Sequence, residues 1–126
     1  MTAAKELTMV VNQIFAGASV ADLDIARAWY ERLMGRPPDL TPNEHEACWQ
    51  VTDTGWVYII ADADRAGCGV LTLLVDDLEA RAAEIAQRGI ETGEIDWVVP
   101  GSVRSVWITD PDGNRIQLGE VRADDA

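Results

Sequence analysis

Apolar residues recur at helical spacing in two stretches of the chain, residues 19–39 and 74–93. A repeat of three to four residues places apolar side chains on one face of a helix, so each stretch predicts an amphipathic helix. The residues expected to be buried are Leu23, Ala26, Tyr30 and Leu33 in the first helix and Leu78, Ala82 and Ile85 in the second.

Both helices carry recognisable start and stop signals. Asp22 and Asp77 each precede a leucine in the pattern V-x-D-L, where a short carboxylate can accept from the free N–H groups of the first turn. Gly35 and Gly89 follow the last apolar positions, and glycine commonly ends a helix.

Each helix is followed by two segments that predict a β-hairpin. EACWQVT and WVYIIAD flank Asp53-Thr54-Gly55, and SVRSVWIT and NRIQLGEV flank Asp110-Pro111-Asp112-Gly113. Glycine at the end of each turn suits the left-handed backbone that such loops require.

The two halves therefore repeat one order of elements. Val20 and Val75 lie 55 residues apart, Thr52 and Thr109 lie 57 apart, and the two turn glycines lie 58 apart. This predicts an α+β fold of two βαβββ modules in a single domain, residues 1–126, with module one at about 8–66 and module two at about 67–121.

Composition narrows the function. The 126 residues carry a net charge of −12, which disfavours nucleic acids and anionic membranes and permits a cationic ligand, although solubility alone also explains the acids. The N-terminus lacks a basic start followed by an apolar signal segment, and no apolar run is long enough to span a bilayer, so we expect a cytoplasmic protein. Cys48 and Cys68 are expected to be free, small core residues.

From about residue 10 to 121 the chain resembles the vicinal oxygen chelate superfamily, which includes glyoxalase I, extradiol dioxygenases and bleomycin-resistance proteins. The resemblance is carried by the two V-x-D-L motifs, by WYERLMGRPP at 29–38 and, most specifically, by DPDGNRIQL at 110–118. It implies an open, curled, barrel-like sheet with helices on the convex side, a ligand cavity between the modules, and a homodimer.

Metal-using members of that superfamily place four ligands, usually His, Gln or Glu, on the cavity faces of four strands. Here the resemblance assigns those positions to Phe15, Ile59, Val70 and Gln117. Three of the four have no lone pair to donate, so we expect no metal and no other cofactor. His45 lies between Glu44 and Glu46, but neighbouring residues of an extended segment do not converge on one ion, so we expect a solvated loop there.

The four positions instead predict an apolar wall with a polar handle. The amide of Gln117 can both donate and accept, which orients a ligand without ionising. Trp49, expected roughly opposite Ile59 in the hairpin, is the tryptophan we assign to the pocket, where its ring could stack on a planar ligand. The predicted ligand-binding residues are Phe15, Trp49, Ile59, Val70 and Gln117.

No motif nominates a catalytic residue, so the leading hypothesis is a metal-free binding protein that sequesters a cationic or aromatic drug-like compound, as antibiotic-resistance proteins of this type do. One alternative is an enzyme of glyoxalase, epimerase or dioxygenase type, either with a relocated metal or as a metal-free isomerase. Another is a regulatory or interaction module whose cavity is filled by its own side chains.

Overall fold

The computed structural model describes residues 9–122, which form seven β-strands and two α-helices. The elements in chain order are β1 (Ile14–Val20), α1 (Leu23–Met34), β2 (Glu46–Gln50), β3 (Gly55–Ala61), the 3-10 helix η2 (Ala63–Arg65), β4 (Val70–Leu74), α2 (Leu78–Gln87), β5 (Asp96–Val99), β6 (Val103–Thr109) and β7 (Arg115–Val121).

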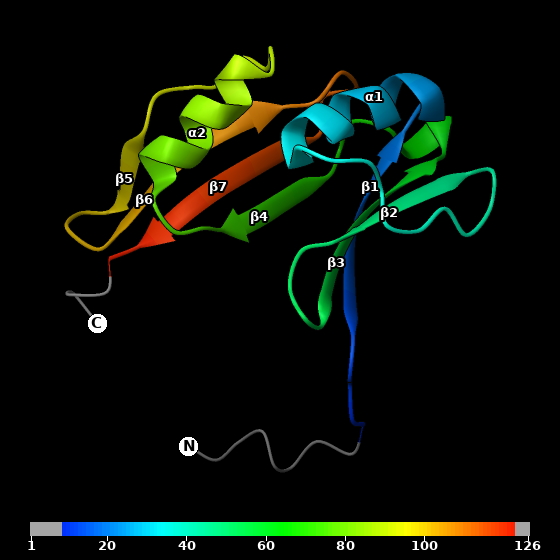
Figure 1. Ribbon diagram of the computed structural model, residues 1–126, viewed down its shortest axis with the longest axis horizontal. Helices are drawn as coiled ribbons and strands as arrows, with labels where there is room; N and C mark the ends of the chain where they lie inside the picture. Colours follow the sequence, from blue (N-terminus) through cyan, green and yellow to red (C-terminus); the bar gives the residue numbers. More distant parts are fainter. Residues whose placement is uncertain (1–8, 123–126) are drawn as a thin grey trace.

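The strands form two open sheets, with the order β1-β3-β2 in the first module and β4-β7-β6-β5 in the second. In each sheet the first strand pairs in parallel with the last, and the remaining pairs are antiparallel. Both helices lie on the same side of the two sheets, whose other side stays open (Figure 1). The predicted α+β fold with helices on the convex side is confirmed, although one strand of the first module is reduced to a single bridge between Leu40 and Cys48.

The sequence signals at the helix ends act as expected. Asp22 accepts from the Ile25 N–H at 3.0 Å, and Asp77 accepts from the Ala80 N–H at 3.3 Å, so each carboxylate caps its helix. Gly35 ends α1 with a φ of 80°, a left-handed conformation that favours glycine. None of the described helices is long and apolar enough to cross a membrane.

The hydrophobic core lies between the helices and the sheet faces beneath them. Of the predicted helix positions, five are buried, and Leu23 and Ala82 pack against the core while partly exposed. The buried five are Ala26, Tyr30, Leu33, Leu78 and Ile85. Cys48 is also buried, and burial together with nearby Glu46 raises the pKa of its thiol. Both cysteines are free, as predicted, but the placement of Cys68 in the core was wrong: the residue is exposed in the loop before β4.

A buried polar cluster joins the two modules where β1 ends and β4 begins. Asn114 is fully buried; its amide nitrogen donates to the Ser19 carbonyl at 2.8 Å, and its amide oxygen accepts from the Gly69 N–H at 2.7 Å. Asp110 accepts from the Tyr30 hydroxyl at 2.7 Å and from the Asn114 amide at 2.8 Å. Every one of these groups has a partner, as burial of polar atoms requires.

Tyr30 acts in this cluster as a neutral donor. Its burial, followed by its hydrogen bond to Asp110 and then by the charges of Asp110 and Asp112, raises the pKa of Tyr30 far above its usual range, so the hydroxyl keeps its proton. Asp112 adds a further link between the modules, because its side chain accepts from the Ala21 N–H at 3.1 Å. The motif DPDGN is thus explained as a structural joint.

Two arginines connect α2 to its neighbours, one to α1 and the other to the second sheet. Arg88 of α2 donates to the carbonyls of Arg32 and, at 3.0 Å, of Leu33, which lie at the C-terminal end of α1. Arg104 of β6 donates to Glu79 on α2 and to Glu120 on β7, each at 2.6 Å. Hydrogen bonds from Arg104 lower the pKa of Glu120, and they lower that of Glu79 to about 2.

Replacement of Asn114 by alanine is expected to lower the free energy of unfolding by about 2–4 kcal/mol, because it removes a fully buried amide and its bonds to the part-buried Ser19 carbonyl and Gly69 N–H. Urea unfolding followed by tryptophan fluorescence measures the change. Asn12→Ala, at an exposed position before β1, is the matched control and should stay within about 0.5 kcal/mol of the parent chain. A similarly small effect of Asn114→Ala would contradict the role of the joint.

Candidate ligand-binding site

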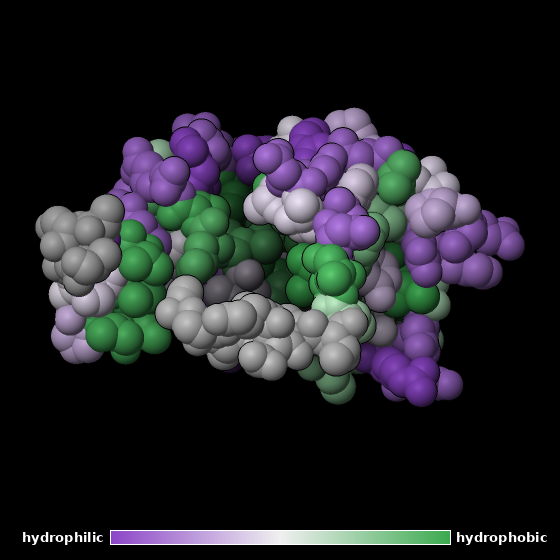
Figure 2. Space-filling model, turned by 90° about the horizontal axis from the view of Figure 1, so that it is seen from below, coloured by the Kyte–Doolittle hydropathy of each residue, from purple (hydrophilic) through white to green (hydrophobic). Residues whose placement is uncertain are grey.

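The registers of the strands assign every side chain of the two sheets to one of two faces. Residues directly opposite each other share a face, and successive residues alternate. The face under the helices holds the core; we call the other one the open face. Seen from the side away from the helices, apolar side chains surround a hollow in the middle of the molecule (Figure 2).

Three of the five predicted site residues lie on the open face. Phe15 pairs with Trp56 in the first sheet, Val70 pairs with Arg115 in the second, and Gln117 pairs with Thr72. Phe15 and Val70 are exposed, and Gln117 is partly buried.

Ile59 and Trp49 were placed on the wrong face. Ile59 pairs with Ala18, and Trp49 pairs with Val57; all four are buried under α1. Trp49 further donates its indole N–H to the Arg36 carbonyl at 3.0 Å. Both side chains are core residues in this structure and have no exposed area from which to reach a ligand on the open face.

The error comes from treating the two turn glycines as equivalent. Gly113 has a φ of 105°, so it serves the turn through its left-handed backbone. Gly55 has no such conformation and is the first residue of β3, where a Cβ would lie 2.6 Å from the Thr52 hydroxyl. In the register of the strands, Tyr58 is the equivalent of Gln117: it pairs with Gly17, two residues beyond Phe15, as Gln117 pairs with Thr72, two residues beyond Val70.

Aromatic rings cover the open face of the first module. Phe15 stacks on Trp56 with ring centroids 5.3 Å apart, and Tyr58 meets Phe15 edge-on at 6.1 Å. Gly17 gives the Tyr58 ring its place, because a Cβ there would lie 2.6 Å from the ring. A hollow of about 360 Å³ lies beside Phe15 and Tyr58.

A short polar relay occupies the open face of the second module. The Gln117 amide oxygen accepts from the Thr72 hydroxyl, and the Gln117 amide nitrogen donates to the Ser105 hydroxyl, both at 3.1 Å. Trp107 lies directly opposite Gln117, and the Arg115 guanidinium lies over the Trp107 ring at 4.1 Å. The sequence did not single out Ser105, Arg115 and Trp107 as a group, since only the register of β6 brings them around Gln117.

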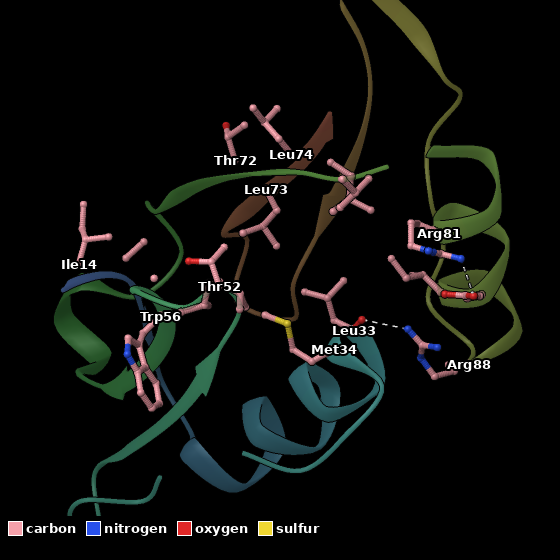
Figure 3. Close-up of a pocket in the computed structure, with 18 residues that line it drawn as sticks. Ile14, Leu33, Met34, Thr52, Trp56, Thr72, Leu73, Leu74, Arg81 and Arg88 are labelled. Atoms are coloured by element: carbon pink, nitrogen blue, oxygen red, sulfur yellow. Dashed lines mark hydrogen bonds and ion pairs between the residues drawn. The ribbon is translucent and has the colours of Figure 1, made fainter. Parts of the chain in front are cut away.

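A larger cleft of about 540 Å³ separates the two modules. Its walls come from the end of α1, the inner side of α2, and strands β1, β3 and β4, so segments far apart in the sequence meet around it (Figure 3). Leu33, Met34 and Leu73 line it with apolar side chains, and Arg81 and Arg88 stand on the α2 side (Figure 3). Thr72 borders the cleft and bonds to Gln117, which connects the cleft to the polar relay of the open face.

Comparison with known proteins identifies the family to which the chain belongs. The family model described as the Glyoxalase/Bleomycin resistance protein/Dioxygenase superfamily matches residues 36–118. The chain belongs to this superfamily. None of the curated proteins compared with the chain matches it.

Solved structures agree with this assignment. A glyoxalase/bleomycin resistance protein from Catenulispora acidiphila DSM 44928 is 39% identical with a TM-score of 0.81, over 87% of this chain and 98% of that one. TnmS3, an antibiotic-binding protein from Streptomyces sp. CB03234, shares the fold at 21% identity and a TM-score of 0.74, over 92% of this chain and 99% of that one. A glyoxalase-related enzyme from Clostridium phytofermentans does so at 16% identity and a TM-score of 0.73, over 91% and 98% of the two chains.

The residues at the superfamily's metal positions do not fit a divalent ion. With Tyr58 in the place first given to Ile59, the four side chains are those of Phe15, Tyr58, Val70 and Gln117. They offer one phenol and one amide, and both polar ends of that amide are already hydrogen-bonded. Among residues 9–122, no three His, Cys, Asp or Glu side chains gather in a group that could hold a metal, and His45 lies in an exposed turn before β2.

The assignment of Tyr58 and Ile59 to opposite faces can be tested by truncating each. Ile59→Ala should lower the free energy of unfolding by about 3 kcal/mol, because it opens a cavity in the core. Tyr58→Ala, on the open face, should lower it by less than about 1 kcal/mol. Urea denaturation of the two variants measures both changes, and the reverse order would restore the original placement of Ile59.

Proposed function

We propose that the protein is a cytoplasmic small-molecule-binding protein of the antibiotic-sequestering type, which captures a planar aromatic compound without the help of a metal. The observation that carries the proposal is the apolar cleft between the modules, which is bordered by Thr72, whose hydroxyl donates to the Gln117 amide. Apolar walls with a few placed polar groups are the usual make-up of a site that holds a small molecule.

The size and lining of the cleft support binding. Pockets for small molecules usually have volumes of about 300–1,000 Å³, apolar walls and a few placed polar groups. The cleft of about 540 Å³ falls in this range, with Leu33, Met34 and Leu73 as walls and Thr72 at its border. A module whose cavity is filled by its own side chains would not leave this space, so the volume favours a binding protein over that alternative.

The similarity to TnmS3, described as an antibiotic-binding protein, also supports the proposal at the level of the fold. A protein with this fold can therefore bind an antibiotic. The fold does not decide the sign of the ligand's charge. The net charge of −12 favours a cation at long range, whereas Arg115 lies two residues from Gln117 on the same face of β7.

The proposal predicts that the chain binds 9-anthracenemethanol, a neutral planar probe, with one molecule per chain. Ala16→Phe should weaken this binding at least about tenfold, since Ala16 lines the cleft from β1 and a phenyl ring there would occupy it. Quenching of tryptophan fluorescence and calorimetric titration give the dissociation constants.

Ala28→Phe is the matched control, because Ala28 is an exposed residue of α1 and does not border the cleft. It should bind the probe as the parent chain does. An Ala16→Phe variant that stays folded and binds with unchanged affinity would place the ligand elsewhere and contradict the proposal.

We also propose that the protein is a homodimer. Large apolar side chains stay exposed in the single chain along β5, the edge strand of the second sheet, namely Trp97, Val98 and Val99. A second copy would remove this apolar area from water. Sedimentation equilibrium should give twice the 13.8 kDa mass of one chain, and a single-chain mass at micromolar concentration would rule the dimer out.

A further inference from the structure

Arg115 is an arginine without a carboxylate partner in an acidic protein. Five other arginines have a nitrogen within 3.0 Å of an Asp or Glu oxygen, namely Arg27, Arg36, Arg65, Arg81 and Arg104. The guanidinium of Arg115 makes no ion pair with any residue of the 9–122 range; its recorded contact is the Trp107 ring, 4.1 Å below it. With 22 acids against 10 bases in the chain, an unpaired cation on the open face, on the same side of β7 as Gln117, is unexpected.

The strand register explains why no acid reaches Arg115. Its neighbours on the open face are Val70 on one side and Thr109 on the other, and neither is charged. The other charged residues of the open face lie on different strands: Glu46 on β2, in the first module, and Asp96 on β5, opposite Ser105, where its carboxylate accepts from the Trp97 N–H.

Arg115 does not line the cleft itself; β7 fixes its position beside the polar relay that reaches the cleft through Thr72. Arg115 and Gln117 are two residues apart on one strand and point the same way, so their Cα atoms are separated by about 7 Å. Trp107 lies opposite Gln117 and beneath the guanidinium. A ligand that extends from the cleft past Thr72 onto Gln117 and Trp107 would bring a substituent of its ring within reach of Arg115.

The stacking on Trp107 prepares Arg115 for this contact. A guanidinium positioned over an indole ring still has N–H donors to offer, and it loses little further freedom when a carboxylate binds. Paired N–H groups match the two oxygens of a carboxylate, a geometry that an ammonium or a neutral hydroxyl group does not offer.

We propose that Arg115 determines the specificity of the site and that the ligand is a planar aromatic molecule with a carboxylate group. This inference rests on the proposed binding function and deepens it. It also differs from the expectation of a cationic ligand, which came from the net charge. Exposed charges farther away than about 8 Å are largely screened at physiological ionic strength, whereas a contact ion pair with Arg115 is not, so the local charge outweighs the net charge.

The test uses three probes with one ring system and different charges: anthracene-9-carboxylate, 9-anthracenemethanol and 9-(aminomethyl)anthracene. Each is titrated into the full chain, into Arg115→Gln and into Arg32→Gln, with calorimetry as the readout. Arg32 is the matched control, since it is an exposed arginine of α1, on the helix side of the sheets and away from the open face that carries Arg115.

The parent chain and Arg32→Gln should bind the carboxylate about tenfold more tightly than the alcohol, and the ammonium most weakly. Arg115→Gln should bind the carboxylate and the alcohol with similar affinity while keeping its affinity for the alcohol. That pattern would support the assignment of Arg115.

Two results would overturn it, and they differ from failure of the proposed function. If the alcohol or the ammonium binds the parent chain as tightly as the carboxylate, the anion preference is wrong although the site binds aromatic rings. If the preference survives in Arg115→Gln, another group is responsible. If none of the three probes binds the folded parent chain, the binding function fails, and this inference with it.

Discussion

The joint built by Asp110, Asn114 and Tyr30 is the constraint on which the rest of the structure depends. It is a set of hydrogen bonds buried between two sheets whose edges otherwise touch little, and its atoms come from β1, α1 and the turn before β7. Because the polar groups are fully paired, they set one relative position of the modules at this end. At the other end Arg88 holds the last turn of α1, and the cleft is the space left between these two attachments.

Much of this arrangement could be predicted from the sequence. Hydrophobic spacing located both helices, the two capping aspartates gave their starts, and the repeat of elements indicated two similar modules. The cluster around Asp110 could not be foreseen in the same way. Its partners Ser19 and Asn114 are 95 residues apart, and a local pattern does not show which distant carbonyl a buried amide will meet.

The candidate site was predicted in part. Phe15, Val70 and Gln117 share the open face, because alternation along a strand needs only one correct anchor. The prediction put Ile59 and Trp49 on the wrong face because it took the register of β3 from Gly55. That glycine is needed for its small size beside Thr52, and it does not adopt the left-handed backbone of a turn. A register error of one residue moves every side chain of a strand to the opposite face of the sheet. For this reason the prediction missed Tyr58 and Trp56, which with Phe15 form the aromatic surface of the first module.

The separation of the two sheet faces has a consequence for how such a protein can change over generations. The hydrophobic core on the helix-facing side and the buried joint hold the strands from behind, while the relay at Gln117 and the stacked pair at Arg115 lie on the outward side. An exchange among the outward side chains therefore disturbs little of the packing that keeps the chain folded. Under the proposed binding function, a few point mutations there would change which compound is bound while the fold stays the same.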